Sequence, residues 1–154
     1  RRANQSRQDF LRDAADILQP QAEQEHVTIS LDLQPIYVYG NASLLSELVM
    51  NLLDNAVKYN RENGTVLLSV RAADQYMVMT VSDTGIGISE EKQKRVFERF
   101  YRRNHQVAGS GLGLAIVGEI CRAHLAPISL HDGEQGGLKV RVSFVLADRR
   151  TQTS

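Results

Sequence analysis

The sequence is poor in the residues that mark secreted, disulfide-bonded or membrane-spanning proteins. Its single cysteine, Cys121, can form neither an internal disulfide nor a cysteine metal cluster, and we expect a small buried apolar residue in a reducing compartment. No apolar run approaches the ~20 residues that span a bilayer, and no signal peptide is visible. A charge excess is also absent, because 18 basic residues balance 18 acidic ones. This balance argues against a nucleic-acid partner.

What the sequence does contain is a succession of helical and strand patterns over 154 residues, a length that suits one domain with its own core. We expect this domain at residues 1–147 and a disordered tail at residues 148–154. Helical patterns occupy residues 10–25, 41–59, 112–124 and part of 89–101, and strand patterns occupy residues 27–33, 36–39, 65–72, 76–82, 127–130 and 138–146. This order predicts an α/β (α+β) two-layer sandwich with helices on a mixed sheet. The abrupt start at Arg1 suggests a fragment of a larger protein.

The helical pattern at residues 41–59 carries an unusual polar face. Glu47, Asn51, Asn55 and Lys58 share an arc of about 80° at 3.6 residues per turn, opposite an apolar face. A solvated helix face would explain charged residues there, but asparagine is a poor helix former and two of them need a reason. Amide oxygens are hard, neutral ligands that suit Mg²⁺ shared with phosphate oxygens. The face therefore points to a magnesium–nucleotide.

A glycine loop follows the strand pattern that ends near Asp83. Gly85 and Gly87 let the backbone approach a flat ligand closely, and the Asp83 carboxylate can accept a hydrogen bond from an exocyclic amine such as adenine N6. A plain turn closed by an aspartate cap is the simpler alternative. Residues 83–85 also match the Asp-Thr-Gly triplet of aspartic proteases. That fold is nearly all strand, however, and does not suit a chain with three long helical patterns.

A second glycine loop, at residues 109–113, runs into the last helical pattern. Its free N–H groups and the helix dipole suit an anion. The spacing is G-x-G-x-G and no strand precedes it, so it is not the dinucleotide fingerprint. Residues 88–110, which lead up to this loop, hold six basic and three acidic residues. A basic segment with glycines at both ends predicts a lid over phosphates, although a solvated charged face would give the same composition.

In this order and spacing, the segments resemble the ATP-binding catalytic domain of sensor histidine kinases, of the GHKL superfamily. Residues 51–59 (Asn-Leu-Leu-Asp-Asn-Ala-Val-Lys-Tyr) resemble the family's N box, and residues 83–87 resemble its G1 box. Residues 97–102 resemble its F box, and residues 109–114 its G2 box. The resemblance covers residues 5–146. It implies a Bergerat fold, which is an open, mixed, mostly antiparallel sheet with three helices on one face and a flexible ATP lid.

The resemblance also implies roles for individual residues. It implies ATP and Mg²⁺ as cofactors, with Mg²⁺ held by Asn51 and Asn55 and adenine read by Asp83. Tyr59 is similar to a residue that packs on the base side. The residues that would contact phosphates are Lys58, Arg99, Arg102 and Arg103. The remaining nucleotide-binding positions would be Gly85, Ile86, Gly87, Gly109, Ser110, Gly111, Leu112, Gly113 and Leu114.

Two segments depart from the family pattern. Gly136-Gly137-Leu138-Lys139 lacks the threonines that the family often has in a third glycine box. His124-Leu125-Ala126-Pro127 replaces a frequent His-Gly-Gly. Both segments are expected to lie outside the catalytic centre.

One position on the asparagine helix indicates the class of reaction. Related hydrolases, such as gyrase and Hsp90-type chaperones, carry a glutamate as general base one turn before the metal-binding asparagine, where this chain has Asn51. An amide cannot take the proton from water, and Glu47 lies a further turn away. We therefore expect weak intrinsic hydrolysis, and transfer of the γ-phosphate to another nucleophile.

The resemblance implies that this nucleophile is a histidine on a separate dimerisation hairpin. None of His26, His105, His124 and His131 lies in the family's histidine motif. The resemblance further implies a downstream response regulator, a parent protein anchored in the bacterial inner membrane with this domain in the cytoplasm, and a monomeric fragment unable to phosphorylate itself. Two alternatives remain open: an anti-sigma-type serine kinase of the same superfamily, and a nucleotide-binding domain without transferase activity.

Overall fold

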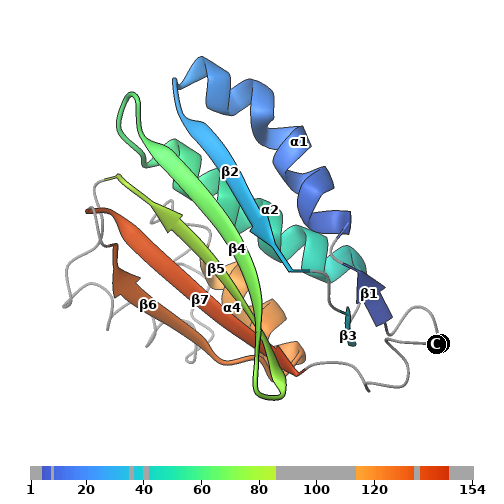
Figure 1. The fold of residues 1–154 in the computed structure, drawn as a ribbon. Helices are drawn as coiled ribbons and strands as arrows, with labels where there is room; N and C mark the ends of the chain where they lie inside the picture. The colour runs from blue at the N-terminus through green and yellow to red at the C-terminus, as the bar shows by residue number, and fades with distance from the viewer. Residues whose placement is uncertain are drawn as a thin grey trace.

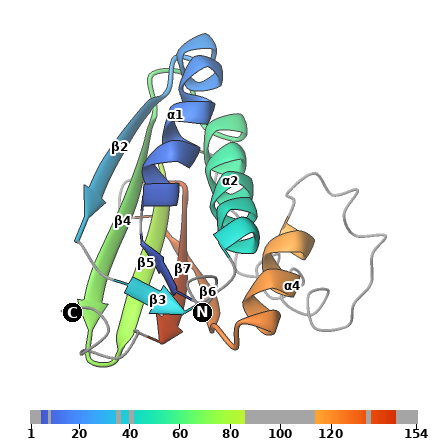
Figure 2. The ribbon, with the colours of Figure 1, turned by 90° about the vertical axis from the view of Figure 1, so that its right-hand side faces the viewer.

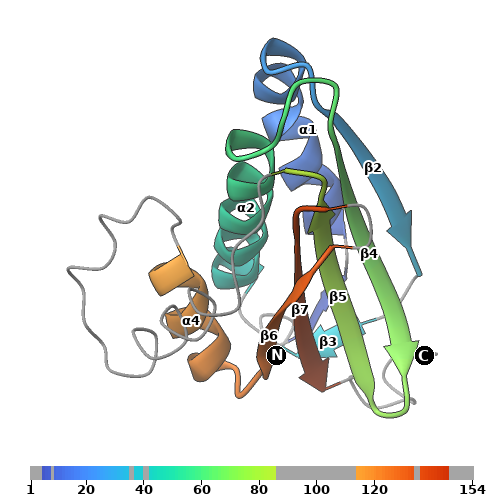
Figure 3. The same cartoon turned by 90° about the vertical axis from the view of Figure 1, so that its left-hand side faces the viewer.

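Helices cover one face of a five-stranded sheet and leave its other face open (Figure 1). This computed structural model describes residues 5–7, 9–34, 37–39, 42–85, 114–133 and 136–145. The helices of the described residues are α1 (Asp9–Gln24), α2 (Ala42–Lys58) and α4 (Leu114–Ala123). Figures 2 and 3 show the helical layer and the sheet layer edge-on from opposite sides. The predicted two-layer α/β sandwich, with three helices on one face of an open mixed sheet, is confirmed.

The main sheet has the strand order β2-β4-β5-β7-β6. Its strands are β2 (Thr28–Leu33), β4 (Thr65–Ala73), β5 (Tyr76–Asp83), β6 (Ile128–Asp132) and β7 (Leu138–Val145). The β2–β4 pair is parallel and all other neighbours pair antiparallel. Because β7 lies next to β5, with Ser82 opposite Lys139, the start of β7 is placed beside the end of β5. This register brings together segments that are more than fifty residues apart in the chain.

The core lies between the helices and the sheet. From Thr65 to Val70 the side chains of β4 alternate, so Val66, Leu68 and Val70 are fully buried while Thr65 and Leu67 face solvent. The buried face of α2 meets this apolar face with leucines, valines and alanine at helical spacing: Leu45, Leu48, Val49, Leu52, Leu53, Ala56 and Val57. The apolar packing of α2 fixes which way its opposite, asparagine-bearing face points.

Two features of the N-terminal region differ from simple expectation. A three-residue strand, β1 (Gln5–Arg7), pairs antiparallel with β3 (Tyr37–Tyr39) in a separate two-stranded sheet. No strand was predicted at β1, because three residues are too few to show a period of two. Pro20 lies inside α1 without ending it. The carbonyl of Asp16, which loses its helical amide donor at Pro20, is on an exposed residue, where water can hydrogen-bond to it.

The expected helical part of residues 89–101, the lid and the tail at 148–154 lie outside the described residues. No helix in the part that the structure describes has the length and apolarity needed to cross a membrane.

Candidate functional site

The end of α2 and the end of β5 meet at one edge of the helical layer, and a glycine makes this contact possible. Gly85 follows β5 and packs against the backbone of Tyr59 and Asn60, at the end of α2. A Cβ atom at position 85 would lie closer than 3.0 Å to the Tyr59 carbonyl oxygen and to the Asn60 Cα. Only glycine lets the predicted first glycine loop start this close to the asparagine helix.

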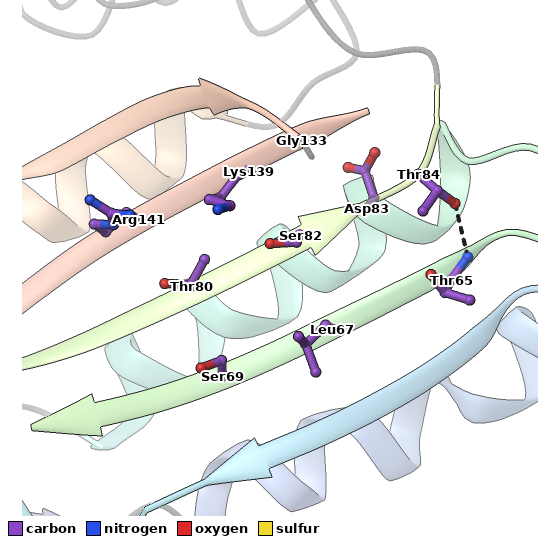
Figure 4. Close-up of a pocket in the computed structure, with 10 residues that line it drawn as sticks. All are labelled: Thr65, Leu67, Ser69, Thr80, Ser82, Asp83, Thr84, Gly133, Lys139 and Arg141. Atoms are coloured by element: carbon purple, nitrogen blue, oxygen red, sulfur yellow. Dashed lines mark hydrogen bonds between the residues drawn. The ribbon is translucent and has the colours of Figure 1, made fainter. Parts of the chain in front are cut away.

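A hydrogen-bonded clamp, made of Asn60, Thr65 and Thr84, fixes the same junction. The Thr84 hydroxyl oxygen accepts from the Thr65 N–H at 3.0 Å (Figure 4) and the hydroxyl donates to Asn60 Oδ1 at 3.1 Å. The Asn60 Nδ2 group donates to the Thr65 carbonyl oxygen at 3.0 Å. The clamp therefore ties the end of α2, the start of β4 and the residue after β5 into one rigid unit. None of its hydrogen bonds was predicted from the sequence, because the three residues belong to no shared pattern.

Asp83, the last residue of β5, has one carboxylate oxygen that backbone N–H groups hold and one without a recorded partner in the described part of the chain. Oδ1 accepts from the Gly85 N–H at 2.8 Å and from the Leu138 N–H at 3.1 Å. Among the described residues, Oδ2 has no recorded hydrogen bond. Burial raises the pKa of Asp83 above its ordinary value, and the two backbone hydrogen bonds oppose that shift. The result is an oriented, partly desolvated acceptor.

The start of β7 belongs to this site, and the expectation that residues 136–139 lie outside the catalytic centre is wrong. Gly137, at φ +82°, packs directly on Asp83, and a Cβ atom there would collide with both the Asp83 carbonyl oxygen and its Oδ1. The next residue, Leu138, donates the second hydrogen bond to Oδ1. The backbone of residues 137 and 138 therefore holds Asp83, and it does so in the segment where the family pattern often has threonines. The paired glycines were the signal in the sequence that could have identified this contact.

The asparagine face of α2 is arranged largely as its spacing predicts. Asn51 donates its Nδ2 to the Glu47 carbonyl oxygen at 2.8 Å, and no hydrogen bond to its Oδ1 is recorded among the described residues. The Nδ2 atom of Asn55 is buried and has no hydrogen-bond partner. Lys58 pairs with Asp54 at 3.4 Å, so its ammonium is at present held by the helix itself. Tyr59 is half-buried beside Gly85.

Several predicted site residues cannot be placed in this arrangement. Those outside the described part of the chain are Ile86, Gly87, Arg99, Arg102, Arg103, Gly109, Ser110, Gly111, Leu112 and Gly113. Leu114 begins α4, and its side chain also lies outside the described part.

The residues present fit a magnesium–nucleotide. The buried Nδ2 group of Asn55 is a donor without a partner, which costs about 1–3 kcal/mol, and an acceptor such as a phosphate oxygen would satisfy it, whereas Oδ1 is the atom suited to a cation. Gly137 leaves room for Asp83, and Gly85 lets the loop after β5 lie against the end of α2. No cluster of three or more His, Cys, Asp or Glu side chains occurs among the described residues. A cation held by Asn51 and Asn55 would therefore share most of its ligands with phosphate oxygens and water, as Mg²⁺ does.

Cys121 and the described histidines play no part in this arrangement. Cys121 is buried, and desolvation raises the pKa of its thiol to about 12, so it is an unreactive apolar residue as expected. His124 Nδ1 lies 2.9 Å from the Ile120 carbonyl oxygen, and His131 Nε2 lies 2.8 Å from the Ser129 hydroxyl. His26 is exposed and lies 3.5 Å from a Glu62 carboxylate oxygen.

Known proteins with similar sequences identify the family. Residues 40–148 match the family described as "Histidine kinase-, DNA gyrase B-, and HSP90-like ATPase". Sensor histidine kinase RppB of Synechocystis sp. is 40% identical over 111 residues, which are 68% of this chain and 24% of that protein. Sensor protein QseC of Escherichia coli O157:H7 is 42% identical over 119 residues, which are 77% of this chain and 26% of that protein.

Solved structures agree with this match. The mycobacterial sensor histidine kinase MprB superposes with a TM-score of 0.78 at 25% identity, and the match covers 92% of this chain and 96% of that one. Full-length ShkA in complex with AMPPNP superposes with a TM-score of 0.75 at 30% identity, covering 90% of this chain and 29% of that one. The chain therefore belongs to this ATPase family, as a catalytic domain of the sensor histidine kinase type. It spans about a quarter of the length of RppB and QseC.

Proposed function

We propose that this domain binds Mg-ATP and presents the γ-phosphate to a histidine on a separate helical hairpin of its parent protein. The observation that carries the proposal is the carboxylate of Asp83, whose Oδ1 is fixed by two backbone N–H groups while Oδ2 has no recorded partner among the described residues. Such an acceptor is suited to the exocyclic N6 amine of adenine. ShkA, which is 30% identical to this chain, was solved with the ATP analogue AMPPNP, and this supports the choice of nucleotide.

The asparagine face of α2 supports the second half of the proposal. Bound Mg²⁺ would neutralise charge on the phosphates, and Asn51 and Asn55 are the amides that would hold it. The unpartnered Nδ2 group of Asn55 would donate to a phosphate oxygen, while its Oδ1 would face the cation. Lys58 would exchange Asp54 for a phosphate, since an exposed ion pair of this kind costs little to break.

Asn51 also favours transfer over hydrolysis. Its amide cannot deprotonate water, and it is tied to the Glu47 carbonyl oxygen rather than to a base. The proposed site further includes Tyr59 and Gly85 beside the base, Arg99, Arg102 and Arg103 at the phosphates, and the loops carrying Ile86, Gly87 and residues 109–114. We also propose residues 1–147 as the domain, a response regulator as the downstream partner, and a membrane-anchored parent with this domain in the cytoplasm.

The test is calorimetry of the 154-residue chain with Mg-ATP and with Mg-GTP, comparing Asp83→Asn with unchanged protein. Because Oδ1 of Asp83 accepts from two N–H groups, an asparagine there turns its oxygen to them and its NH₂ toward the ligand. The NH₂ group of the introduced asparagine then faces the N6 amine of adenine, and two donors cannot form a hydrogen bond with each other. ATP affinity should fall roughly 10- to 100-fold, and the loss of affinity for GTP, whose O6 is an acceptor, should be smaller.

Asp74→Asn is the matched control. Asp74 is exposed in the turn at the other end of β5 and has φ 57°, a conformation that asparagine also tolerates. This variant should bind Mg-ATP as the unchanged chain does. Absence of Mg-ATP binding by the folded chain, or equal affinity in the Asp83 and Asp74 variants, would rule the proposal out.

A further inference from the structure

The carboxylate of Asp83, at the end of β5 (Figure 4), can hold a proton on only one of its two oxygens. Its Oδ1 atom accepts the Gly85 N–H at 2.8 Å and the Leu138 N–H at 3.1 Å. A carboxylate oxygen has two lone pairs, and these two N–H groups use both of them. No partner of Oδ2 is recorded among the described residues. A proton taken up by Asp83 therefore goes to Oδ2.

The surrounding backbone also prevents the carboxyl group from hiding that proton. If the group turned over, its O–H would point at the N–H groups of Gly85 and Leu138, and donors would then face donors. The turn before β7 packs on the same side, since a Cβ atom at Gly137 would lie 2.5 Å from Oδ1. The proton consequently stays on the oxygen that the proposed nucleotide site turns toward the base.

Burial makes this proton easier to gain than it is for an aspartate in water. It raises the pKa of Asp83, and the two backbone hydrogen bonds oppose the rise. On β4, the residue opposite Asp83 is the uncharged Val66. The titratable residues nearest to Asp83 on the other described elements around it are Lys58 and Tyr59 on and after α2, Asp132 on β6 and Lys139 on β7. None of these four groups is a cause of the raised pKa of Asp83.

The two protonation states of Asp83 present opposite hydrogen-bonding groups to a purine. The ionised Oδ2 is an acceptor, which suits the amine at C6 of adenine. The protonated Oδ2 is a donor, which suits the carbonyl oxygen at C6 of hypoxanthine or guanine. Enzymes use half-buried carboxylic acids in both ways, because a neutral carboxyl group can donate where an ionised one can only accept.

We propose that Asp83 selects a 6-amino purine nucleotide when it is ionised and a 6-oxo purine nucleotide when Oδ2 carries a proton. This inference rests on the proposed function, because it requires that the base lies against Asp83. Mg-ATP binding then releases a proton from any protonated Asp83, whereas binding of a 6-oxo nucleotide takes one up. Affinity for Mg-ATP therefore rises with pH through the pKa of Asp83, and affinity for the 6-oxo nucleotide falls. Acidification weakens the Mg-ATP complex.

Inosine triphosphate (ITP) is the matched probe, because its base has an oxygen where adenine has the amine and lacks the 2-amino group of guanine. Both nucleotides carry the same ribose and phosphates, so phosphate titration and Mg²⁺ binding cancel in the ratio of their affinities. Calorimetry of the 154-residue chain with Mg-ATP and with Mg-ITP, from about pH 7 to about pH 5, measures this ratio. The preference for ATP over ITP should fall roughly fivefold over this range.

Two variants assign the effect to Asp83. Asp83→Asn presents an NH₂ donor at every pH, so its ATP-to-ITP ratio should be low and should not change with pH. Asp74→Asn, in the turn at the other end of β5, should keep the pH dependence of the unchanged chain. Titrations in buffers of different ionisation enthalpy count the protons exchanged. Mg-ATP should release more protons than Mg-ITP, and Asp83→Asn should abolish this difference.

A readout on the unchanged chain serves if Asp83→Asn impairs folding. The NMR signal of the Asp83 carboxyl carbon should titrate at a lower pH with Mg-ATP bound and at a higher pH with Mg-ITP bound. Equal shifts with the two nucleotides overturn the inference.

The outcomes separate the inference from the proposed function. If the chain binds Mg-ATP but its ATP-to-ITP ratio is independent of pH, the inference is overturned and the proposed function stands. An equal pH dependence in Asp83→Asn places the proton on another group and also overturns the inference. If the folded chain binds Mg-ATP at no pH, the proposed function fails, and the inference fails with it.

Discussion

The position of Asp83 depends on the absence of side chains around it. A Cβ atom at Gly137 would overlap the carbonyl and carboxylate oxygens of Asp83, and a Cβ atom at Gly85 would overlap the backbone of Tyr59 and Asn60. Backbone N–H groups of Gly85 and Leu138 then supply the hydrogen bonds that a side chain would otherwise provide. An acceptor held by backbone cannot rotate away, which is the kind of preorganisation that favours binding.

Gly137→Ala should therefore weaken Mg-ATP binding as well as the fold. The new Cβ would displace Asp83, and both effects should appear together in calorimetry and thermal denaturation. Gly136→Ala is a matched control, because Gly136 has a similar φ of +86° but nothing within 4 Å of a built Cβ. The control should lose about 1 kcal/mol of stability from backbone strain and keep its nucleotide affinity. Equal affinities in the two variants would show that Gly137 does not position Asp83.

At the scale of elements, one hydrogen-bonded junction decides where the site forms. The clamp of Asn60, Thr65 and Thr84 joins the end of α2 to the start of β4 and to the end of β5. Through it, the asparagine face and Asp83 become parts of one unit, although they lie in different layers of the fold. Strand and helix propensities set the elements, whereas these few side-chain contacts set the angle between them.

Thr84→Val should loosen this unit. The valine keeps the shape but removes the hydroxyl, so the Thr65 N–H and Asn60 Oδ1 each lose a partner. We expect a loss of about 1–3 kcal/mol in the free energy of unfolding and weaker Mg-ATP binding. Thr84→Ser restores the hydroxyl and should recover most of both quantities. If the serine and valine variants behave alike in urea unfolding and in calorimetry, the hydroxyl has no positioning role.

The turn between α4 and β6 contains a residue in an unfavourable conformation. Leu125 has φ 53° and is 85% exposed, so it is strained without gaining burial in the domain. Leu125→Asn should raise stability by about 1 kcal/mol, because asparagine adopts the left-handed region more easily. Ile17→Asn removes a similarly exposed apolar side chain from α1 without relieving strain, and should be neutral or destabilising. A melting temperature that rises in both variants, or in neither, would contradict this explanation.

At the scale of the whole molecule, the proposed transfer needs a second domain. His26 follows the end of α1, His124 contacts a helix carbonyl, and His131 lies beside Ser129. None of these histidines has a recorded contact with Asp83 or with the asparagine face. In the proposed function, this domain offers the phosphate and another domain supplies the nucleophile. The chain spans only about a quarter of the length of RppB and QseC.

Incubation of the 154-residue chain with Mg-[γ-³²P]ATP should accordingly give no acid-labile phosphohistidine. Adding an isolated histidine-hairpin domain of a sensor histidine kinase should produce label on the hairpin, and Asp83→Asn should reduce that label in proportion to its loss of ATP affinity. Acid-labile label on the chain alone would refute the expectation. Label on serine of a supplied partner, and none on the hairpin, would instead favour the anti-sigma-type alternative.

The sequence by itself determined the elements and the polar face of α2. Apolar residues that repeat every two residues in a strand, or every 3.6 in a helix, show which side of that element is buried. The two layers, and the side of α2 that carries Asn51 and Asn55, could therefore be predicted from each segment alone. The order of residues in the segment also indicated that Asp83 lies at the end of a strand, just ahead of the glycine loop. The β1–β3 pair escaped prediction because strands of three residues carry no measurable period.

Only the tertiary structure decided how those segments meet. The hydrogen bond from Leu138 to Asp83 joins residues 55 positions apart, and the clamp joins Thr65 to Thr84 across 19. No local pattern encodes such contacts, because they arise from the strand order that places β7 beside β5. The same order gathers Lys139, Arg141, Thr80 and Ser82 on one open face. Local burial patterns can show which way each side chain faces, but only packing decides which side chains become neighbours.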